Sequence, residues 1–412
     1  MITIIENARL FDGVSPECPD GMSVLVEGSR IREVSEGTIK NNGNVRRIDA
    51  GGRFLIPGLI DVHIHAYASH VDLQRVENQG HAYRTAHAAR MLGHALDCGF
   101  TTVRDIGGGD WSLAAAIADK LVRAPRFFYA GRVISMTGGH GDMRPMHVSR
   151  HDHGLCQCGE SGVFSVLADG VDECLKAVRE ELRQGAHCIK IMGSGGVTSP
   201  ADPIWMNQYR EDEIRAIVNE CAERRTYVSS HCHGADAVRR CVDFGVRVIE
   251  HATLIDRDTA SHVAKAGAYV VPTMATIFAL MEEGGAVGLP PVSQEKIKVA
   301  YAAALEGMAH MRDAGVKLGF GTDLLGATVF RQCSEFRIRR EVFSPVEILR
   351  QATSGSAAIL MREGELGCIA NGAVADLLLV DGDPLEDIGV LAEQGRNLAL
   401  IIRDGEIVKE RL

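Results

Sequence analysis

Between about residues 53 and 325 the chain repeats one pattern of hydrophobic and polar positions. Each unit has a short apolar run, a polar or glycine-containing loop, and a longer stretch in which apolar residues recur every three or four positions. A period of 3.6 residues is that of an amphipathic helix, so each unit predicts a strand followed by a helix. Two of the predicted helical faces consist of Val171, Leu175, Val178 and Leu182, and of Ile214, Ile217, Val218 and Cys221.

Eight apolar runs have the length and composition of buried strands. Strands that alternate with helices form parallel sheets, because each helix carries the chain back to the starting edge. Eight such units in succession predict an α/β fold that closes into a (β/α)₈ barrel of the TIM type. We place the strands at residues 56–65, 99–106, 126–135, 186–193, 226–233, 246–253, 268–275 and 316–323.

The two ends of the chain follow a different pattern. Residues 1–50 and 371–412 consist of short alternating strands separated by turns such as Asp12-Gly13. Two β-rich ends that flank a barrel predict one small β-sandwich built from both termini. The predicted domains are residues 1–56 and 361–412 for the two parts of the sandwich, and residues 57–360 for the barrel.

Composition and charge narrow the class of partner. The 412 residues are 46% hydrophobic and 24% charged, with a net charge of −10 and no dense run of Lys or Arg. A nucleic-acid or anionic-membrane surface is therefore not expected. The least polar run, residues 268–281, is too short to span a membrane and contains Pro272. We expect a small-molecule substrate and a homo-oligomeric protein.

The N-terminal residues and the cysteines bear on location. The first residues alternate like a strand and lack the basic and apolar regions of a signal peptide. The eleven cysteines are odd in number and have no framework spacing, which favours reduced thiols. We therefore expect a cytoplasmic protein.

The first candidate metal ligands are His63 and His65, which lie at the end of an apolar run. In a strand, residues i and i+2 point to the same face, so both imidazoles project to one side at a spacing that suits a single metal ion. Two histidines satisfied by ordinary hydrogen bonds would be the better interpretation of a bare His-x-His. It is disfavoured here because further ligand-type residues follow at the ends of other predicted strands: Lys190, His231, His251 and Asp323.

Lys190 occupies an inward position of its predicted strand, because Ile189 and Ile191 face the helices. A buried, unpaired ammonium is costly, so the amine would be neutral. A neutral lysine amine can react with carbon dioxide, and the resulting carbamate can bridge two divalent cations. The alternative is an ordinary ion pair with a carboxylate such as Asp323. The four histidines nearby favour the carbamate.

Other polar residues are candidates for contact with the substrate. His140 lies among glycines on the loop after the third strand, where it can polarise a scissile carbonyl. His233 shares a face with His231, and Tyr209 is a candidate for the mouth of the pocket. The long loop from Gly138 to Gly170 predicts a lid or an active-site loop. Within it, His151, His153, Cys156 and Cys158 are ligand types at close spacing, although a polar loop without a metal is the commoner interpretation.

The set of candidate ligands resembles that of the amidohydrolase superfamily in its binuclear, carboxylated-lysine subtype. The set consists of the His-x-His of strand 1, the Lys of strand 4, two later His and the Asp of strand 8. Ile56-Pro-Gly-Leu-Ile-Asp-Val-His-Ile-His65 and the segment from Gly372 resemble the junctions of that superfamily between barrel and sandwich. Several segments are also similar to prolidase-like bacterial dipeptidases that cleave Xaa-Pro or Xaa-Arg/Lys dipeptides. These are Thr137-Gly-Gly-His-Gly-Asp142, Lys190-Ile-Met-Gly-Ser-Gly-Gly-Val197, residues 209–218 and residues 321–326.

The resemblance implies a hydrolase of amide or peptide bonds with two divalent ions, expected to be Zn²⁺, that share a hydroxide and the Lys190 carbamate. Asp323 would accept the proton of the hydroxide, and His140 would support the oxyanion. Such dipeptidases carry His-Ala-Tyr after strand 5, where this chain has His231-Cys-His233, so His233 is expected to contact the substrate. One ion would be held by His63, His65 and Asp323, and the other by His231 and His251.

Three alternatives stay open. The substrate class could be an N-acyl or aryl-amide amino acid, or a lactam, in place of a dipeptide. A mononuclear deaminase on the same barrel would place a Glu three residues after the strand-5 His, where this chain has Gly234. A non-catalytic scaffold would have lost ligands, and every ligand position is filled here. The metal content distinguishes these classes, at about two, one and zero ions per chain.

Overall fold

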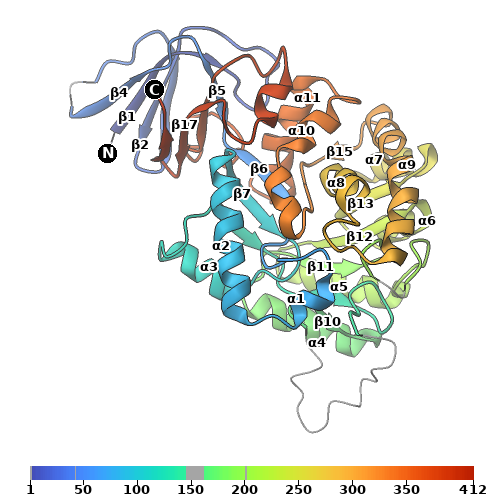
Figure 1. The fold of residues 1–412 in the computed structure, drawn as a ribbon. Coiled ribbons are helices and arrows are strands. Elements are labelled where there is room, and N and C mark those ends of the chain that lie inside the picture. Colours follow the sequence, from blue (N-terminus) through green and yellow to red (C-terminus); the bar gives the residue numbers. More distant parts are fainter. Residues whose placement is uncertain (1, 42, 145–161, 200–201) are drawn as a thin grey trace.

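The computed structural model describes residues 2–41, 43–144, 162–199 and 202–412 (Figure 1). One sheet is built from the two ends of the chain, and helices surround two further, parallel sheets. The candidate ligands from His151 to Cys158 lie outside the described residues. None of the helices in these ranges combines the length and apolar composition needed to span a membrane.

Both ends of the chain contribute to one eight-stranded sheet, here called the terminal sheet. Its central strand, β5 (Phe54–Pro57), pairs in parallel with β1 and antiparallel with β16, so it joins the N-terminal strands to the C-terminal ones. The strand order is β18-β17-β16-β5-β1-β2-β3, and β4 pairs with β1. The remaining strands are β1 (Ile2–Leu10), β2 (Met22–Glu27), β3 (Arg30–Glu36), β4 (Val45–Asp49), β16 (Leu377–Val380), β17 (Leu398–Arg403) and β18 (Glu406–Glu410).

The apolar run of β16 is explained by its position between two hydrophobic cores. Leu377 and Leu379 pack into the core of the terminal sheet. Leu378 and Val380 point the other way, into the large core around the parallel strands. Successive side chains of a strand face opposite sides, so a strand that is covered on both faces needs an apolar residue at every position.

All eight predicted strand segments of the central region contain a strand. Every pairing within the two parallel sheets is parallel, as alternating strands and helices require. The three-stranded sheet contains β6 (Leu59–Ile64), β7 (Phe100–Asp105) and β8 (Arg126–Tyr129). The seven-stranded sheet, in the order β10-β9-β11-β12-β13-β14-β15, contains β9 (Val133–Ser135), β10 (Ser165–Leu167), β11 (Ile189–Met192), β12 (Val228–Gly234), β13 (Val248–Leu254), β14 (Tyr269–Val271) and β15 (Lys317–Leu318).

The predicted single strand at residues 126–135 is two strands, β8 and β9. The chain turns between them at Gly131, whose φ of 73° is a conformation that glycine adopts without cost. A Cβ at this position would lie 2.2 Å from Oε2 of Glu181. The strand β10, inside the long loop from residue 138 to 170, has no counterpart among the predicted strands.

Backbone hydrogen bonds connect the two parallel sheets at both of their edges. On one side, Val62 N donates to Phe320 O at 2.8 Å, and Asp323 N donates to His63 O at 2.8 Å. On the other side, His187 N donates to Tyr129 O at 2.8 Å. These bonds bring the end of β6 against the segment after β15, which places His63 beside Asp323.

The helices follow the predicted order, with one change of face. In α5, Ile214, Ile217 and Cys221 are buried as predicted. In α4 the buried face is rotated towards Glu181, whose carboxylate accepts from N and Nε of Arg132. The helices are α1 (Leu73–Glu77), α2 (His81–Asp97), α3 (Trp111–Ala118), α4 (Gly170–Arg183), α5 (Glu211–Glu223), α6 (Ala235–Asp243), α7 (Arg257–Ala266), α8 (Met274–Glu283), α9 (Pro291–Asp313), α10 (Ser334–Arg339), α11 (Pro345–Arg350) and α12 (Ser356–Ile359), with shorter turns η2 (Gly326–Arg331), η3 (Gln351–Gly355) and η4 (Ile388–Ala392).

An ion pair ties the terminal sheet to the parallel strands. Arg126 of β8 donates to Asp376 at 2.6 Å, and the Asp376 side chain is 5% exposed. This contact therefore connects the two parts of the fold through a buried carboxylate.

Asp376→Asn should lower the free energy of unfolding by about 1–3 kcal/mol, because a neutral amide is a weaker acceptor for the Arg126 guanidinium than the buried carboxylate. The matched control is Glu406→Gln, because Glu406 is 68% exposed and pairs with Lys120. That change should cost less than about 1 kcal/mol. Urea unfolding of both variants measures the difference, and equal losses would contradict the assignment.

Candidate metal centre and active site

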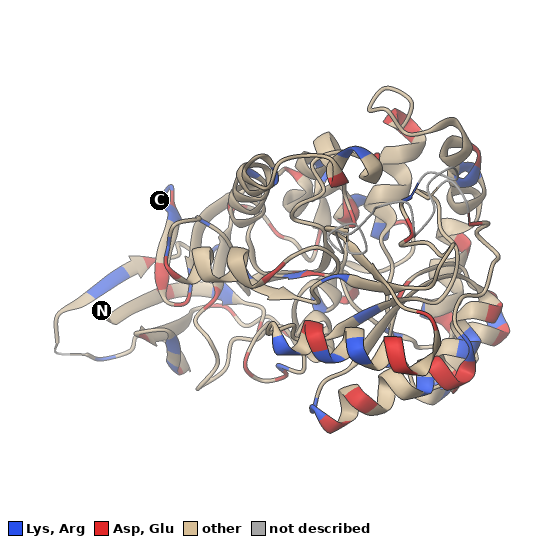
Figure 2. Ribbon diagram, turned by 90° about the horizontal axis from the view of Figure 1, so that it is seen from below, with Lys and Arg blue, Asp and Glu red and all other residues tan. Residues whose placement is uncertain are grey.

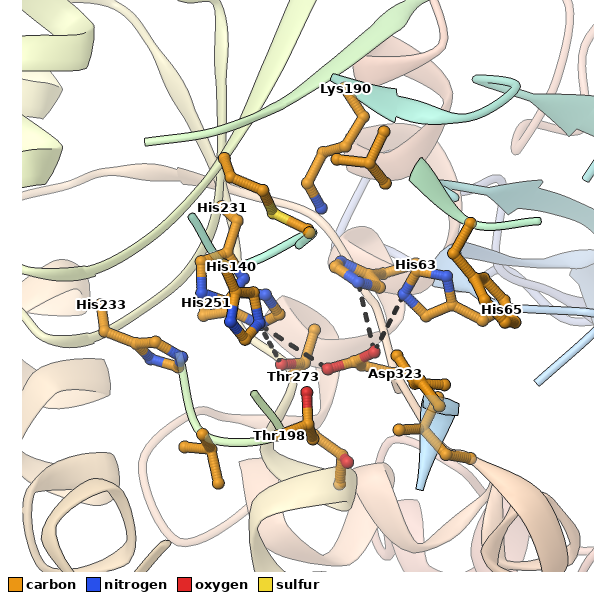
Figure 3. Close-up of a pocket in the computed structure, with 18 of the residues that line it drawn as sticks. His63, His65, His140, Lys190, Thr198, His231, His233, His251, Thr273 and Asp323 are labelled. Carbon is orange, nitrogen blue, oxygen red and sulfur yellow. Dashed lines mark hydrogen bonds and ion pairs between the residues drawn. The ribbon is translucent and has the colours of Figure 1, made fainter. Parts of the chain in front are cut away.

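The six predicted metal ligands line one cavity of about 80 Å³ (Figure 3). They come from the carboxyl ends of different strands, and in parallel strands these ends lie at the same edge of the sheet. The residues are His63 in β6 and His65 just after it, Lys190 in β11, His231 in β12, His251 in β13, and Asp323 after β15.

Asp323 lies at the centre of the ligand cluster. Its Oδ1 is 3.4 Å from Nε2 of His63 and 3.3 Å from Nε2 of His65. Its Oδ2 is 3.9 Å from Nδ1 of His251. Burial alone would raise the pKa of Asp323, but the neighbouring histidines hold that pKa well below its usual value. The carboxylate is therefore ionised, which is the form that binds a cation.

The far side of each strand-1 imidazole has a fixed partner. Nδ1 of His63 lies 2.7 Å from Oε2 of Glu250, and Nδ1 of His65 lies 2.9 Å from the carbonyl oxygen of Gly107. A histidine that donates from Nδ1 presents the lone pair of Nε2, and this arrangement is the usual support for metal-binding histidines. Both Nε2 atoms point towards Asp323 (Figure 3).

His231 and His251 form the second group of imidazoles, with ring centroids 4.5 Å apart. Burial lowers the pKa of both rings well below the usual value, so both are neutral, as a ligand must be. Ligand atoms of His63, His251 and Asp323 lie within 4.8 Å of one another and could hold a metal ion. His251 thus lies beside both Asp323 and His231, and the division of the ligands between two ions stays a prediction.

Lys190 reaches into the cavity from β11 (Figure 3). The residue is 2% exposed, and no hydrogen bond or ion pair joins its ammonium to any part of the chain that the structure describes. Burial lowers the pKa of the amine, while the carboxylates of Glu250 and Asp323 oppose this effect. The ordinary ion pair with Asp323, which the sequence left open, is not formed among the described residues.

Glu250 and Arg104 are functional neighbours that the sequence reasoning missed. Both side chains are fully buried, and Nη2 of Arg104 donates to Oε1 of Glu250 at 2.6 Å. Burial would raise the pKa of Glu250, but the charges of Arg104 and His63 hold it below its usual value. Arg104 also donates to the carbonyl of Val62 at 2.6 Å. The only sequence signal was a carboxylate directly before His251, and alternation assigns that position to the opposite face.

The backbone at two ligands departs from regular strand geometry. His251 has a φ of 72° and Asp323 a φ of 53°. Positive φ is uncommon for residues other than glycine and is held in place by the surrounding structure. His251 and the following Ala252, with a φ of 49°, interrupt the alternation within β13, so that Glu250 and His251 can both serve the same centre.

His140 is held against the ligand cluster from the loop after β9. Its Nδ1 lies 2.7 Å from Oγ of Ser199 and 3.1 Å from Oδ2 of Asp202. Its ring stacks on that of His231 at a centroid distance of 4.3 Å. Since Nδ1 is occupied by these partners, Nε2 is the atom left to act on a ligand in the cavity.

The other two predicted substrate contacts have different environments. His233 lines the cavity, its Nδ1 lies 3.1 Å from Oγ1 of Thr253, and burial lowers its pKa to about 3. Tyr209 is buried away from the cavity lining, and its hydroxyl donates to the carbonyl of Ala168 at 3.0 Å. We therefore do not place Tyr209 among the substrate contacts.

Much of the rest of the cavity wall is apolar. It is formed by side chains from α1, α8, α9 and the turn after Asp323, so segments far apart in the sequence meet here. Within the described ranges, Asp323 is the only carboxylate among the lining residues, and Lys190 is the only lysine or arginine. The apolar lining residues include Leu73, Phe164, Ile277, Leu280, Ile297 and Leu325.

A model of the amidohydrolase family matches residues 54–408. The chain belongs to the amidohydrolase family. The ochratoxinase of Aspergillus niger is 29% identical over 355 residues, which are 82% of this chain and 72% of that protein. A solved amidohydrolase structure is 44% identical with a TM-score of 0.96, and a prolidase complexed with N-methylphosphonate-L-proline is 42% identical with a TM-score of 0.95. Each covers 100% of both chains, so this chain is a prolidase-like hydrolase acting on C–N bonds.

Glu250→Gln should weaken the binding of divalent metal ions about 10–100-fold, because the amide is a poorer partner for His63 and Arg104. Competition with a chromophoric chelator measures the affinity. The matched control is Glu335→Gln, since Glu335 is equally buried and paired with Arg339, but its carboxylate bonds to Arg339 and the amide of Ala275 and not to a ligand histidine. An equal loss of metal affinity in both variants would show a general effect on folding, contrary to this expectation.

Proposed function

We propose that this amidohydrolase cleaves the amide bond of a small dipeptide, with Xaa-Pro as the first candidate, in a site that holds two divalent metal ions. The observation that carries the proposal is one cavity lined by four ligand-type histidines, Asp323 and Lys190. Of these histidines, His231 and His251 are neutral, and Lys190 has no hydrogen-bond or ion-pair partner among the described residues. The likeness to a prolidase along the whole chain supports the choice of substrate.

The donor set fits two hard-to-borderline divalent ions such as Zn²⁺. Imidazole nitrogen and carboxylate oxygen are the ligands that Zn²⁺ takes in hydrolases. In our proposal His63, His65 and Asp323 would hold one ion, and His231 and His251 the other. Lys190 would contribute to both as its carbamate, for which a buried amine with no partner among the described residues is suited. Bound there, the ions would polarise the scissile carbonyl and lower the pKa of a water molecule.

Three side chains of the protein would carry out the proton transfer, the support of the carbonyl oxygen and the contact with the substrate. Asp323 takes a proton from the attacking water and delivers it to the leaving amine, since its carboxylate lies at the centre of the cluster. Nε2 of His140 contacts the carbonyl oxygen as negative charge develops there. His233 contacts the carbonyl or the terminal carboxylate of the substrate from its position on β12.

The apolar wall favours substrates with neutral, apolar side chains over substrates with basic side chains. An arginine or lysine side chain would meet Leu280 and Ile297, and no second carboxylate lines the described part of the cavity. Burying an unpaired charge costs several kcal/mol in an apolar site, on the order of a hundredfold or more in affinity. Within the dipeptidases we therefore favour Xaa-Pro over Xaa-Arg/Lys. An N-acyl or aryl-amide amino acid, or a lactam, is the second candidate because its acyl group would also suit this wall.

The proposal includes the details of the fold on which the site depends. The two parallel sheets would close into a (β/α)₈ barrel, a closure supported by the backbone bonds at both edges. The terminal sheet would fold as a β-sandwich, with domain limits at residues 1–56, 57–360 and 361–412. Strand β5 ends at Pro57 and β6 begins at Leu59, which suits the first limit.

We propose the same partners and the same cellular location as the sequence predicts. Acidic and basic residues are interleaved along the outer helices, which suits a small-molecule substrate better than a nucleic acid (Figure 2). The nine cysteines in the described ranges are free thiols, which suits the expected cytoplasmic location. The homo-oligomeric state stays a prediction.

A panel of dipeptides and N-acyl amino acids tests the substrate. We expect the zinc-loaded enzyme to hydrolyse Leu-Pro and Ala-Pro with a kcat/KM at least about tenfold above Ala-Arg and Ala-Lys, since the basic side chains bury an unpaired charge. The chelator-treated enzyme is the control. Turnover of N-acyl amino acids without turnover of any Xaa-Pro dipeptide would select the second candidate. Preference for Ala-Arg would contradict the role of the apolar wall.

Lys190→Ala should abolish turnover and lower the metal content of the purified protein by at least one ion per chain. Short carboxylic acids, which can replace the carbamate, should restore part of the activity and of the bound metal. Elemental analysis and activity measurements with and without acetate or propionate test this expectation. Full activity and two bound ions in Lys190→Ala would refute the carbamate.

A further inference from the structure

Lys296 of helix α9 contacts the loop after β11. The ammonium of Lys296 donates to the carbonyl oxygens of Gly196 at 3.0 Å, Ser199 at 2.8 Å and Asp202 at 2.6 Å. A lysine ammonium has three N–H donors, so these carbonyls use all of them. The three acceptors lie about one hundred residues before Lys296 in the sequence, so the contact depends on the tertiary fold.

The same three loop residues hold His140. The hydroxyl of Ser199 and the carboxylate of Asp202 are the partners of Nδ1 of His140. Gly196 lies against the imidazole, since a Cβ at this position would be 2.2 Å from Cε1 of His140. The amide of Gly196 donates to Oδ2 of Asp202 at 2.9 Å, which connects the acceptors of Lys296 to one another. Each carbonyl that Lys296 binds thus belongs to a residue that touches or orients His140.

We infer that Lys296 is a positioning residue, which fixes Gly196, Ser199 and Asp202 in the loop after β11 and, through these residues, the ring of His140. No other lysine or arginine of the described chain donates to these three carbonyls. The neighbouring Ile297 lines the cavity directly, so α9 both shapes the wall and bonds to the loop after β11. The effect on turnover rests on the proposed function, whereas the effect on the loop does not.

An ordinary tether between a helix and a loop would give the same contacts, so the test must separate the two roles. Lys296→Met removes the ammonium and keeps a long side chain, and Lys296→Arg keeps a cationic donor. Lys298→Met is the matched control, because Lys298 is on the same helix, is exposed, and pairs with Glu295 alone among the described residues. His140→Ala removes the group on which Lys296 is inferred to act.

Hydrogen exchange measures the loop without any need for activity. The amides of Gly195 and Gly196 are bonded within the loop, to the Met206 carbonyl and to Asp202. In Lys296→Met we expect these amides to exchange about tenfold faster or more, while exchange in β12 and β13 stays as in the wild type. Lys298→Met should leave the loop unchanged, and Lys296→Arg should restore most of the protection. Unchanged loop exchange in Lys296→Met would refute the inference.

A double-mutant cycle measures the action on His140. Lys296→Met should lower kcat about 10–100-fold with a smaller change in KM and with unchanged metal content, since a misplaced His140 acts mainly on the transition state. In the His140→Ala background the same substitution should cost less than about twofold, because residues that act through one another are not additive. A full loss in that background would show that Lys296 acts elsewhere. If no tested substrate is turned over, the proposed function fails while hydrogen exchange still decides the role of Lys296.

Discussion

The buried contact of Glu250 with Arg104 and His63 is the interaction on which the centre depends. It joins β13, β7 and β6 in the interior of the protein, since Glu250 and Arg104 are fully buried and His63 is 1% exposed. Leaving one charge of such a group without its partner is strongly unfavourable, so the three strands are held in one arrangement. That arrangement fixes which nitrogen of His63 faces Asp323, and the remaining ligands are placed around this pair.

The supporting contacts of the cavity follow one rule. Each imidazole has one nitrogen bonded to an oxygen of the scaffold: His65 to Gly107, His140 to Ser199 and Asp202, His233 to Thr253, and His251 to Thr273. The partner sets the rotation of the ring and the nitrogen that is presented to the cavity. Because these partners are backbone carbonyls, hydroxyls or carboxylates on neighbouring elements, the geometry of the centre is a property of the assembled fold.

The site has two sides with different physical character. The polar side is built from strand ends and is rigid, because the strands are bonded to their neighbours along the sheet. The apolar side is built from α1, α8 and α9, which lie outside the sheets. In the proposed function, the chemistry and the substrate preference therefore depend on separate elements. The contact of Lys296 with the loop after β11 links them, since it joins the helix of the apolar side to the loop that holds His140.

The sequence by itself determined the repeating strand and helix units and the residues at the ends of the strands. The hydrophobic period locates each strand, and a parallel arrangement brings all the carboxyl ends to one edge, so His63, His65, Lys190, His231, His251 and Asp323 were expected together. Tertiary structure decided what local pattern does not encode. The turn at Gly131, the positive φ of His251 and Asp323, and the inward Glu181 break the regular period because each is fixed by a contact from a distant segment. The Glu250–Arg104 pair and the Lys296 contact join residues 146 and about 100 positions apart, a separation at which a single sequence carries no pattern for pairing.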